Sequence, residues 1–554
     1  MYPKKKLAQL VITACEQYHI KTIVISPGSR NAPLTIGFSN SEKINTLSIV
    51  DERCAAFFAL GIAQQTQEPV AIVCTSGSAL LNYYPAIAEA YYSKIPLLVI
   101  SADRPKHLID IGDGQTIRQE HVLNNHIIYE ANLVEDDSEH NAKYICTTIH
   151  AARLKKGPVH INVPFNEPLY ETVEVIGSDV TEEIAIEKSR IKSLDPFNID
   201  YKNLSEIWNN STRKLIIVGV NNPSERLQKV IDEIAEDESV LVFIEATSNL
   251  HNEKFVNSID KLITKLTEDD FKKLQPELLI TLGGMVVSKR IKKMLRTYSP
   301  AHHWHIDSTR EMNTYFCLSE YIKKEPEIFF NEIKSRITKV KSNYRDTWVE
   351  EKYARTEKHD SFIKEVKYSD FKVFDIVLKS IPNYRQLQVS NSSIIRYVQL
   401  FDVNPTLEIF CNRGTSGIDG STSTAIGAAY INTTQTICIT GDLSFFYDSN
   451  ALWNTNIPKN FRIIIVNNSG GGIFKIIPGP KSTNALPYFE VPHQLTAEHL
   501  AKMYDFEYKS VSDAESLQYE LINFYKKTNQ PKILEIFTPS NLNDEVLKQY
   551  FNSL

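Results

Sequence analysis

The chain has 554 residues, of which 42% are hydrophobic and 23% are charged, and its formal net charge is −6. At roughly 100–200 residues per domain, this length predicts about three domains. The lysines and arginines are scattered, and no apolar run approaches the ~18 residues that span a bilayer, so neither nucleic acid nor a membrane is an expected partner.

Short apolar runs alternate with helical patterns along the whole chain. Runs expected to form strands lie at 22–26, 70–74, 96–101 and 158–163, then at 214–220, 240–246, 277–283 and 302–307, and finally at 387–390, 407–411, 436–440, 461–466 and 532–537. Short apolar strands separated by helices indicate parallel sheets that are covered on both faces. We therefore predict an α/β fold class with three doubly wound parallel-sheet domains, at residues 1–180, 200–340 and 365–554.

Polar, glycine-rich segments follow many of these strands. They are SPGSR (26–30), TSGSA (75–79), SADRP (101–105), SNSS (390–393), NRGTSGIDG (412–420), GDLS (441–444) and NNSGGGIF (467–474), whereas the middle third offers mainly GGMVVSKR (283–290). Ligands of open α/β sheets bind just beyond the carboxyl ends of the strands. We therefore expect the binding chemistry in the outer two domains and a mostly structural middle domain.

The segments GDLS and NNSGG follow two successive strands of the last third. If these strands are neighbours, Asp442 lies beside Asn467 and Asn468, and a carboxylate, an amide oxygen and a backbone carbonyl form an oxygen set suited to Mg²⁺. Glycines let the backbone approach a diphosphate, and a following helix N-terminus attracts it. A helix cap and a turn would explain each segment alone, but not the ordered pair.

Other nucleotide sites fit the sequence less well. No GxxxxGK[ST] motif is present, and GTSGIDG (414–420) has a different glycine spacing from GxGxxG, so a P-loop or a Rossmann dinucleotide site is not favoured. The pair GDLS and NNSGG instead resembles the diphosphate-binding signature GDG…NN of thiamine-diphosphate enzymes, with Leu443 in place of the second glycine.

This resemblance implies a glutamate beside N1′ of the aminopyrimidine, supplied from another domain. Glu52 fits this role because it follows LSIV (47–50) and opens an apolar helix, although Asp51 and Glu52 could also simply favour the helix N-terminus. The partly desolvated Glu52 would share a proton with N1′ and activate the cofactor. The resemblance also implies a bulky apolar residue beneath the cofactor, and Ile418 fits.

Six arginines lie in or just beyond the loops at the expected ligand-binding ends of the strands. They are Arg30, Arg104, Arg118, Arg290, Arg396 and Arg413, and Lys289 stands beside one of them. Arginine binds carboxylates in a bidentate manner, so this number of cations indicates substrates with several carboxylates rather than pyruvate.

Taken together, SPGSR, DER, TSGSA, ADRP, GDGQTIRQ, SKR, NSSIIR, NRGTSGIDG, GDLS and NNSGGGIF resemble the family of 2-succinyl-5-enolpyruvyl-6-hydroxy-3-cyclohexene-1-carboxylate synthases, thiamine-diphosphate enzymes of menaquinone biosynthesis. The resemblance runs from about residue 7 to the C-terminus. It implies decarboxylation of 2-oxoglutarate and 1,4-addition of the succinic-semialdehyde carbanion to isochorismate. Both substrates are dianions, in agreement with the arginines.

The resemblance also implies a role for each matching residue. Glu52 would be catalytic, and Asp442, Asn468 and the carbonyl of Gly470 would hold Mg²⁺ or Mn²⁺. Thiamine diphosphate would be lined by Glu52, Asn391, Ser392, Ile418, Asp442, Leu443, Ser444, Asn468, Gly470, Gly472, Ile473 and Phe474. The substrates would be bound by Ser29, Arg30, Arg104, Gln115, Lys289, Arg290, Ser392, Arg396, Arg413 and Ile477.

The family also implies a homodimer or homotetramer, because Glu52 and Asp442 of one active site come from different chains.

The seven cysteines form no CxxC pair and several lie in apolar runs, which predicts buried thiols in the reducing cytoplasm. His303 and His305 alternate along one expected strand and could resemble metal ligands, but a structural role is favoured because no further Cys/His pair completes a set. The alternative functions are another thiamine-diphosphate decarboxylase or carboligase and, in a different class, a nucleotide-binding protein.

Overall fold

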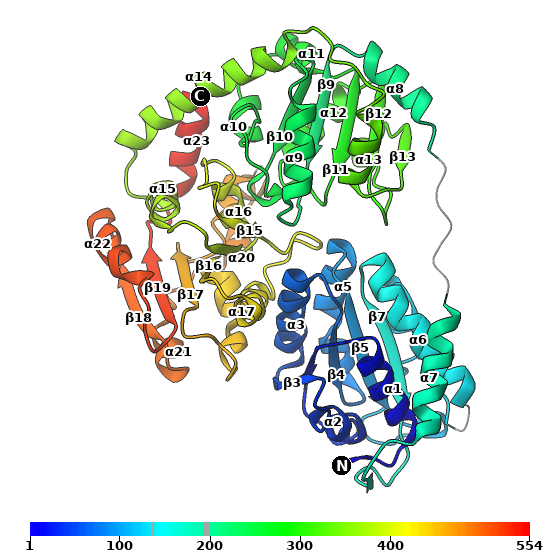
Figure 1. The fold of residues 1–554 in the computed structure, drawn as a ribbon. Coiled ribbons are helices and arrows are strands. Elements are labelled where there is room, and N and C mark those ends of the chain that lie inside the picture. The colour runs from blue at the N-terminus through cyan, green and yellow to red at the C-terminus, as the bar shows by residue number, and fades with distance from the viewer. Residues whose placement is uncertain (136–137, 192–198, 478) are drawn as a thin grey trace. The chain divides into compact units, whose positions relative to one another are not determined.

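The computed structural model describes residues 1–135, 138–191, 199–477 and 479–554 (Figure 1). The chain forms two compact units. The first contains Met1–Asp195, Asn412–Thr436 and Ser444–Phe461, and the second contains Pro196–Cys411, Ile437–Leu443 and Arg462–Leu554. Two segments from the last third of the chain, 412–436 and 444–461, therefore pack with the N-terminal residues.

The first unit is built on a six-stranded parallel sheet. In spatial order its strands are β3 (Asn45–Ser48), β2 (Thr22–Ile25), β4 (Val70–Cys74), β5 (Leu97–Asp103), β7 (Val159–Pro164) and β6 (Glu130–Asn132), and β1 (Tyr2–Pro3) pairs separately with β8 (Thr172–Val173). Its helices are α1 (Lys6–Gln17), α2 (Ala32–Ser39), α3 (Glu52–Thr66), α4 (Ser78–Asn82), α5 (Tyr84–Ser93), α6 (Ser138–Lys155), α7 (Ser178–Arg190) and α17 (Ser421–Ile431).

Both faces of this sheet are covered by helices. Ile23, Val73 and Ile161 share one core with α1, α2, α6 and α7, whereas α3 contacts β2, β4 and β5 and packs against α5 and α17. Successive side chains of a strand point to opposite faces, so double cover explains why β4 is buried along its whole length.

The second unit contains a five-stranded and a six-stranded sheet. The five-stranded sheet has the order β10 (Val240–Ile244), β9 (Lys214–Val218), β11 (Leu278–Leu282), β12 (His302–Ile306) and β13 (Glu320–Ile322), all parallel. Its helices are α8 (Tyr201–Asn210), α9 (Glu225–Ile234), α10 (Ile259–Ile263), α11 (Glu268–Leu274), α12 (Lys289–Thr297), α13 (Pro326–Ile333) and α14 (Tyr344–Glu365). Ile216 belongs to one core cluster and its neighbour Ile217 to another, so this sheet is also buried on both faces.

The six-stranded sheet carries the two motifs of the last third. Its order is β15 (Glu408–Phe410), β14 (Gln386–Val389), β16 (Thr436–Gly441), β17 (Arg462–Asn467), β19 (Lys532–Phe537) and β18 (Glu507–Val511). Its helices are α15 (Asp370–Ser380), α16 (Ser393–Val398), α19 (Ile473–Ile476), α20 (Leu486–Glu490), α21 (Glu498–Met503), α22 (Ala514–Phe524) and α23 (Asn543–Ser553). Helix α18 (Asp442–Tyr447) begins in this unit, but from Ser444 onwards it belongs to the first unit. One of its faces packs through Ile439, Ile464 and Leu534 against α15, α16, α22 and α23.

The predicted fold class of parallel α/β sheets is therefore confirmed, and six strands that the sequence did not reveal are added. Of these, β1 and β8 pair with each other, and β3, β6, β13 and β18 each lie at the edge of a larger sheet. An edge strand has one neighbour and a partly exposed flank, so it needs few apolar residues and shows no continuous apolar run. Within the described residues, no helix is long and apolar enough to cross a membrane.

Candidate active site

The structure brings GDLS and NNSGG together at the carboxyl ends of two adjacent strands. Strands β16 and β17 are parallel neighbours, with Gly441 paired to Val466. Asp442 follows β16 directly, and its Oδ2 accepts a hydrogen bond of 2.9 Å from the backbone N–H of Gly470. The two motifs therefore form one site in which Asp442 and Asn468 are both buried.

Asp442 lies in an environment that disfavours its charge unless a cation is near. Burial raises the pKa of Asp442 to about 6, although backbone hydrogen bonds from Gly470 and Leu443 and the nearby His493 lower it. The Nε2 atom of His493 lies 3.3 Å from Oδ2 of Asp442. Sequence reasoning missed His493, because nothing in its local sequence connects it to residues 50 positions away.

Asn468 presents one unsatisfied oxygen. Its Nδ2 donates a 2.9 Å hydrogen bond to Oδ2 of Asp370, whereas its Oδ1 is buried without a hydrogen-bond donor among the described residues. Leaving a buried polar atom unpaired costs about 1–3 kcal/mol, so such an oxygen indicates a missing partner. A hard divalent cation that also binds the Asp442 carboxylate fits this donor set.

Gly470 needs to be glycine at this position. Its φ is +145°, and a Cβ atom would lie 2.6 Å from the carbonyl oxygen of Glu490. No group of three His, Cys, Asp or Glu within the described ranges could hold a metal. A cation here would therefore depend on amide and carbonyl oxygens as well as on Asp442, which agrees with the predicted set of Asp442, Asn468 and the Gly470 carbonyl.

The first asparagine of the pair holds the loop in place. The Nδ2 atom of Asn467 donates to Oε1 of Glu535 at 2.7 Å, and its Oδ1 accepts from the backbone N–H of Ser469 at 3.0 Å. Glu535 is fully buried and also accepts from the N–H of Ala497. Asn467 is therefore occupied within the fold, and Asn468 is the residue with a free oxygen.

The residues predicted to line the cofactor lie around these loops. Ile473 and Phe474 open α19 and are partly buried, and a Cβ on Gly472 would lie 3.0 Å from the amide nitrogen of Asn468. Ser392 follows β14 and has a φ of +67°, which is a strained conformation for serine and one that clusters at functional sites. Asn391 beside it is buried.

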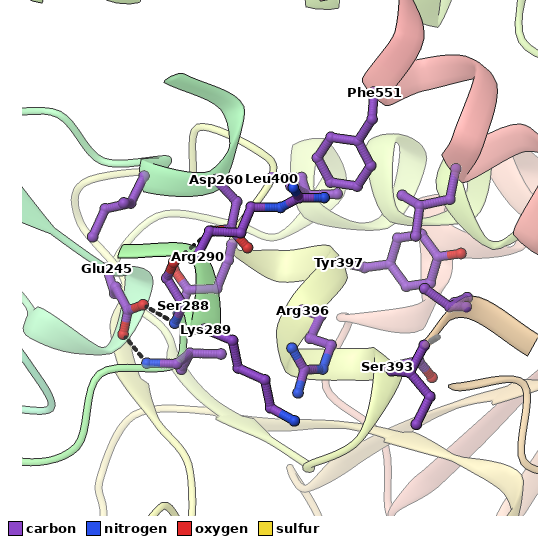
Figure 2. A pocket seen from close by; sticks show the side chains of 16 residues that line it. Glu245, Asp260, Ser288, Lys289, Arg290, Ser393, Arg396, Tyr397, Leu400 and Phe551 are labelled. Atoms are coloured by element: carbon purple, nitrogen blue, oxygen red, sulfur yellow. Dashed lines mark hydrogen bonds between the residues drawn. The ribbon is translucent and has the colours of Figure 1, made fainter. Parts of the chain in front are cut away.

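A second part of the site is a cavity of about 190 Å³ in the second unit (Figure 2). It brings together four of the residues predicted to bind substrate: Lys289, Arg290, Arg396 and Ile477. Lys289 and Arg290 open α12, whereas Arg396 comes from α16 of the neighbouring sheet. Lys289 and Arg290 are therefore the two cations through which the middle third of the chain, otherwise expected to be mostly structural, lines this cavity.

The loop before α12 is anchored by a buried carboxylate. Glu245 accepts hydrogen bonds from the backbone N–H groups of Val287 at 2.7 Å and Ser288 at 2.8 Å. The hydroxyl of Ser288 in turn caps α12 and donates to Asp260. The Arg290 guanidinium lies 5.1 Å from the centre of the Phe551 ring. Figure 2 shows the Arg290 side chain reaching towards this ring.

In the first unit, Glu52 is the first residue of α3 and is partly buried. Its two neighbours bind the segment after α18. Asp51 caps the helix by accepting from the N–H of Cys54, and it also accepts a 2.8 Å hydrogen bond from Asn450. Arg53 donates to the carbonyl of Tyr447 at 2.9 Å. Asp51 and Arg53 thus fix the helix start, whereas the one hydrogen bond of the Glu52 side chain within the described part of the chain is a long one of 3.5 Å, from Asn82.

The predicted loop at 412–420 is held by Glu89, which sequence reasoning missed. Glu89 is buried on α5 and accepts from the N–H groups of Gly414 and Thr415, each at 2.7 Å. This contact fixes the backbone next to Arg413. Within the same unit, the hydroxyl of Ser444 donates to the carbonyl of Ile418 at 2.7 Å, so these two predicted cofactor residues lie together.

The remaining predicted substrate residues also belong to the first unit. Arg30 is buried and donates to the carbonyl of Phe165 at 2.8 Å, with Glu167 3.0 Å away. Arg104 lines a polar cavity of about 720 Å³ at the ends of β5, β6 and β7 and donates to the carbonyl of Gly114. Ser29 and Gln115 are both exposed. Arg118 lines the same cavity and pairs with Asp110.

His303 and His305 share one contact inside the five-stranded sheet, the hydroxyl of Thr281. Both are buried in β12, and Nε2 of His303 and Nδ1 of His305 each lie 2.9 Å from the hydroxyl of Thr281. Burial, together with the neighbouring His305, lowers the pKa of His303 to about 4. None of the seven cysteines, all of which the structure describes, forms a disulfide, and all except the partly exposed Cys317 are buried.

Comparisons with known proteins agree with this geometry. Residues 5–127 match the family described as "Thiamine pyrophosphate enzyme, N-terminal TPP binding domain", and residues 392–536 match "Thiamine pyrophosphate enzyme, C-terminal TPP binding domain". The first match covers Glu52 and the second covers Asp442 and Asn468, so the fold and the site define a thiamine-diphosphate enzyme.

Relatives of this chain are similar over its whole length. They include proteins named "2-succinyl-5-enolpyruvyl-6-hydroxy-3-cyclohexene-1-carboxylate synthase" from Flavobacterium psychrophilum at 54% identity, Flavobacterium johnsoniae at 53% and Bacteroides thetaiotaomicron at 36%, each with 100% of both chains covered. The chain belongs to the 2-succinyl-5-enolpyruvyl-6-hydroxy-3-cyclohexene-1-carboxylate synthase family.

Proposed function

We propose that the chain decarboxylates 2-oxoglutarate and adds the remaining four-carbon unit to isochorismate by 1,4-addition, which gives 2-succinyl-5-enolpyruvyl-6-hydroxy-3-cyclohexene-1-carboxylate and CO₂ in menaquinone biosynthesis. The name shared by the full-length relatives supports this product. Bound thiamine diphosphate supplies the electron sink for the loss of CO₂.

The observation that carries the choice of substrates is the cavity with three cations. Lys289, Arg290 and Arg396 line one space in the same unit as Asp442 and Asn468. Two dianionic substrates require this much positive charge, whereas a monocarboxylate such as pyruvate does not. Each charge-assisted hydrogen bond contributes about 1.5–3 kcal/mol, so a few of them select a dicarboxylate.

The roles that we propose for the other residues follow their places in the fold. Asp442, Asn468 and the Gly470 carbonyl would hold Mg²⁺ or Mn²⁺. Glu52, at the partly buried start of α3, would hold a proton at N1′ of the aminopyrimidine. Thiamine diphosphate would be lined by Asn391, Ser392, Ile418, Leu443, Ser444, Gly472, Ile473 and Phe474. Ser29, Arg30, Arg104, Gln115 and Arg413 would contact substrate, with Ile477 as an apolar wall.

We further propose that the chain works in the cytoplasm as a homo-oligomer in which Glu52 and Asp442 of one active site belong to different subunits. Two features support this proposal. Glu52 and Asp442 lie in different compact units of the chain, and each unit has its own set of predicted ligand residues. The mostly buried cysteines, which form no disulfides, agree with a reducing compartment.

Mass spectrometry of the product tests this function. The purified chain with thiamine diphosphate, Mg²⁺, 2-oxoglutarate and isochorismate should form the adduct and release an equal amount of CO₂. If CO₂ release from 2-oxoglutarate is unaffected by isochorismate and no adduct forms, the chain is a different thiamine-diphosphate decarboxylase or carboligase. Failure to bind thiamine diphosphate would exclude both.

A further inference from the structure

We propose that Asp370 is a positioning residue that fixes the side-chain amide of Asn468 so that the amide oxygen faces the metal site. Asp370 does not itself touch the metal in this proposal. The inference rests on the proposed function only in assuming that a divalent cation binds between Asp442 and Asn468.

Asp370 is held rigidly at a junction of four elements. It is the first residue of α15, and its side chain is 2% exposed. Its backbone N–H donates to Oδ1 of Asn543 at 2.8 Å, at the start of α23. Its Oδ1 accepts from the hydroxyl of Thr538, just beyond β19, at 2.6 Å. Its other oxygen, Oδ2, is therefore directed at Asn468, which follows β17.

The contact between the two side chains decides the orientation of the amide. An asparagine side chain has an acceptor oxygen on one side and a donor NH₂ group on the other, and the hydrogen-bond partners decide which group points where. Oδ2 of Asp370 lies 2.9 Å from Nδ2 of Asn468. Both oxygens of Asp370 accept hydrogen bonds, Oδ1 from Thr538 and Oδ2 from Asn468, so Oδ2 selects the NH₂ group and turns the amide oxygen away from itself.

This orientation leaves the amide oxygen directed away from Asp370. Oδ1 of Asn468 is buried and has no hydrogen-bond donor among the described residues. If the amide were flipped, its oxygen would face the acceptor oxygen of Asp370 and its NH₂ group would face the expected cation, and both contacts would be repulsive.

Variants of Asp370 separate positioning from charge. Asp370→Ala removes the acceptor and frees the amide to rotate. Asp370→Asn removes the charge but keeps an acceptor oxygen for Asn468, because its NH₂ group can face the Thr538 hydroxyl instead. Thr538→Val removes the neighbouring hydrogen bond without touching the amide and serves as the matched control for stability. Asn468→Ala removes the proposed ligand itself.

Mn²⁺ binding, followed by electron paramagnetic resonance with saturating thiamine diphosphate, gives a readout that does not require turnover. We expect Asp370→Ala to weaken Mn²⁺ binding by about 10–100-fold, as is typical for residues that orient metal ligands. Asp370→Asn and Thr538→Val should stay within about threefold of the unmodified protein. In a double-mutant cycle, Asp370→Ala should add nothing to Asn468→Ala, because the two changes remove the same interaction.

Several results would overturn the inference. Unchanged Mn²⁺ affinity in folded Asp370→Ala would exclude positioning, and equal weakening in Asp370→Asn would assign the effect to charge. Equal weakening in Thr538→Val, or additive losses in the cycle, would indicate a general structural role. If the unmodified protein binds no Mn²⁺ with thiamine diphosphate, the proposed metal site itself is wrong, which is distinct from a failure of Asp370 alone.

Discussion

At the scale of single residues, the cations of the second unit show how a few side chains can define a substrate class. Arg396 is partly buried and reaches the cavity from α16, whereas Lys289 and Arg290 are exposed at the start of α12. A partly desolvated guanidinium binds a carboxylate more strongly than an exposed one, because solvent screens it less. Arg396 should therefore contribute more to substrate affinity than either neighbour.

Replacing Arg396 by methionine tests this expectation. Arg396→Met keeps a long apolar stem but removes the charge and all five donors. We expect the KM for at least one of the two dianionic substrates to rise by about 10–150-fold, which corresponds to one lost charge-assisted hydrogen bond. Steady-state kinetics with each substrate varied in turn measures this effect.

The matched control is Arg226→Met on the exposed surface of α9. Arg226→Met should leave both KM values unchanged. If Arg396→Met also leaves both KM values unchanged, Arg396 does not bind substrate.

Local sequence points to residues of this kind, because each one lies at the end of an apolar strand or the start of a helix. The buried carboxylates that hold them are different. Asp370 is 98 residues from Asn468, and Glu89 is 325 residues from Gly414. No local pattern connects such pairs, since their contact exists only once the sheets have formed. Alignment of related sequences would be the signal that could find them.

At the scale of elements, the position of Glu52 depends on the close packing of α3 against α17. A Cβ on Gly61 would lie 2.1 Å from the carbonyl oxygen of Thr424, and a Cβ on Gly427 would lie 1.9 Å from that of Phe58. The two helices therefore touch backbone to backbone, and each requires glycine at the crossing. Sequence periodicity predicted an apolar helix after Glu52 but not its partner.

We expect Gly61→Ala to push the two helices apart. Overpacking of a tight core typically costs about 1–3 kcal/mol, so the thermal unfolding midpoint should fall by several degrees. Turnover should also fall, because Glu52 begins the displaced helix. Differential scanning calorimetry and steady-state kinetics measure the two effects.

Gly114→Ala is the control, because a Cβ there would meet nothing within 4 Å. If Gly61→Ala unfolds at the same temperature as the control, the helix crossing has enough room for a side chain.

Asp448 contacts both α3 and α17, and its titration makes the stability of the first unit depend on pH. It accepts from the N–H of Ser423 on α17 at 2.7 Å and lies 3.8 Å from Arg53 on α3. Burial raises the pKa of Asp448 to about 6 from its usual 3.8, although Ser423 and Arg53 lower it. A raised carboxyl pKa contributes stability that is present below pH 3.8 and is lost as the pH rises through 6.

Asp448→Asn removes this titration while keeping an acceptor oxygen. Relative to this variant, the unmodified protein should lose about 1–3 kcal/mol of unfolding free energy between pH 4 and pH 7. Urea unfolding midpoints at intervals across this range measure the difference between the two proteins. A difference that stays constant with pH would show that Asp448 does not titrate in this window.

Some elements of the fold could not be predicted from the sequence. Strands β3, β6, β13 and β18 lie at sheet edges, where polar residues such as the first-position glutamates of β6, β13 and β18 leave too little apolar content to stand out. The central strands were predicted to within about a residue or two because both of their faces are buried. The folding of 412–436 and 444–461 into the first unit depends on tertiary packing and has no local signal.

At the scale of the whole molecule, the candidate site is divided between two compact units of one chain. The first unit holds Glu52, Arg30, Arg104 and Arg413, and the second holds Asp442, Asn468 and the cavity with Lys289 and Arg396. If active sites are shared between subunits, as we propose, this division leads to a direct prediction.

Mixed oligomers should restore activity that each variant lacks alone. Glu52→Gln and Asp442→Ala chains should both be inactive, but their coexpressed heterodimer should regain one intact site if Glu52 and Asp442 come from different subunits. Differently tagged chains allow the heterodimer to be purified and assayed. No activity in the mixed species would place both residues of a site in the same chain.

The central proposal is that Glu52 activates bound thiamine diphosphate, and the Glu52→Gln variant tests this role most directly. The variant removes the proton relay to N1′ with little change in shape. We predict that CO₂ release from 2-oxoglutarate falls by about 100-fold or more, while the unfolding midpoint of the protein stays unchanged. Near-normal CO₂ release by the folded variant would contradict the account.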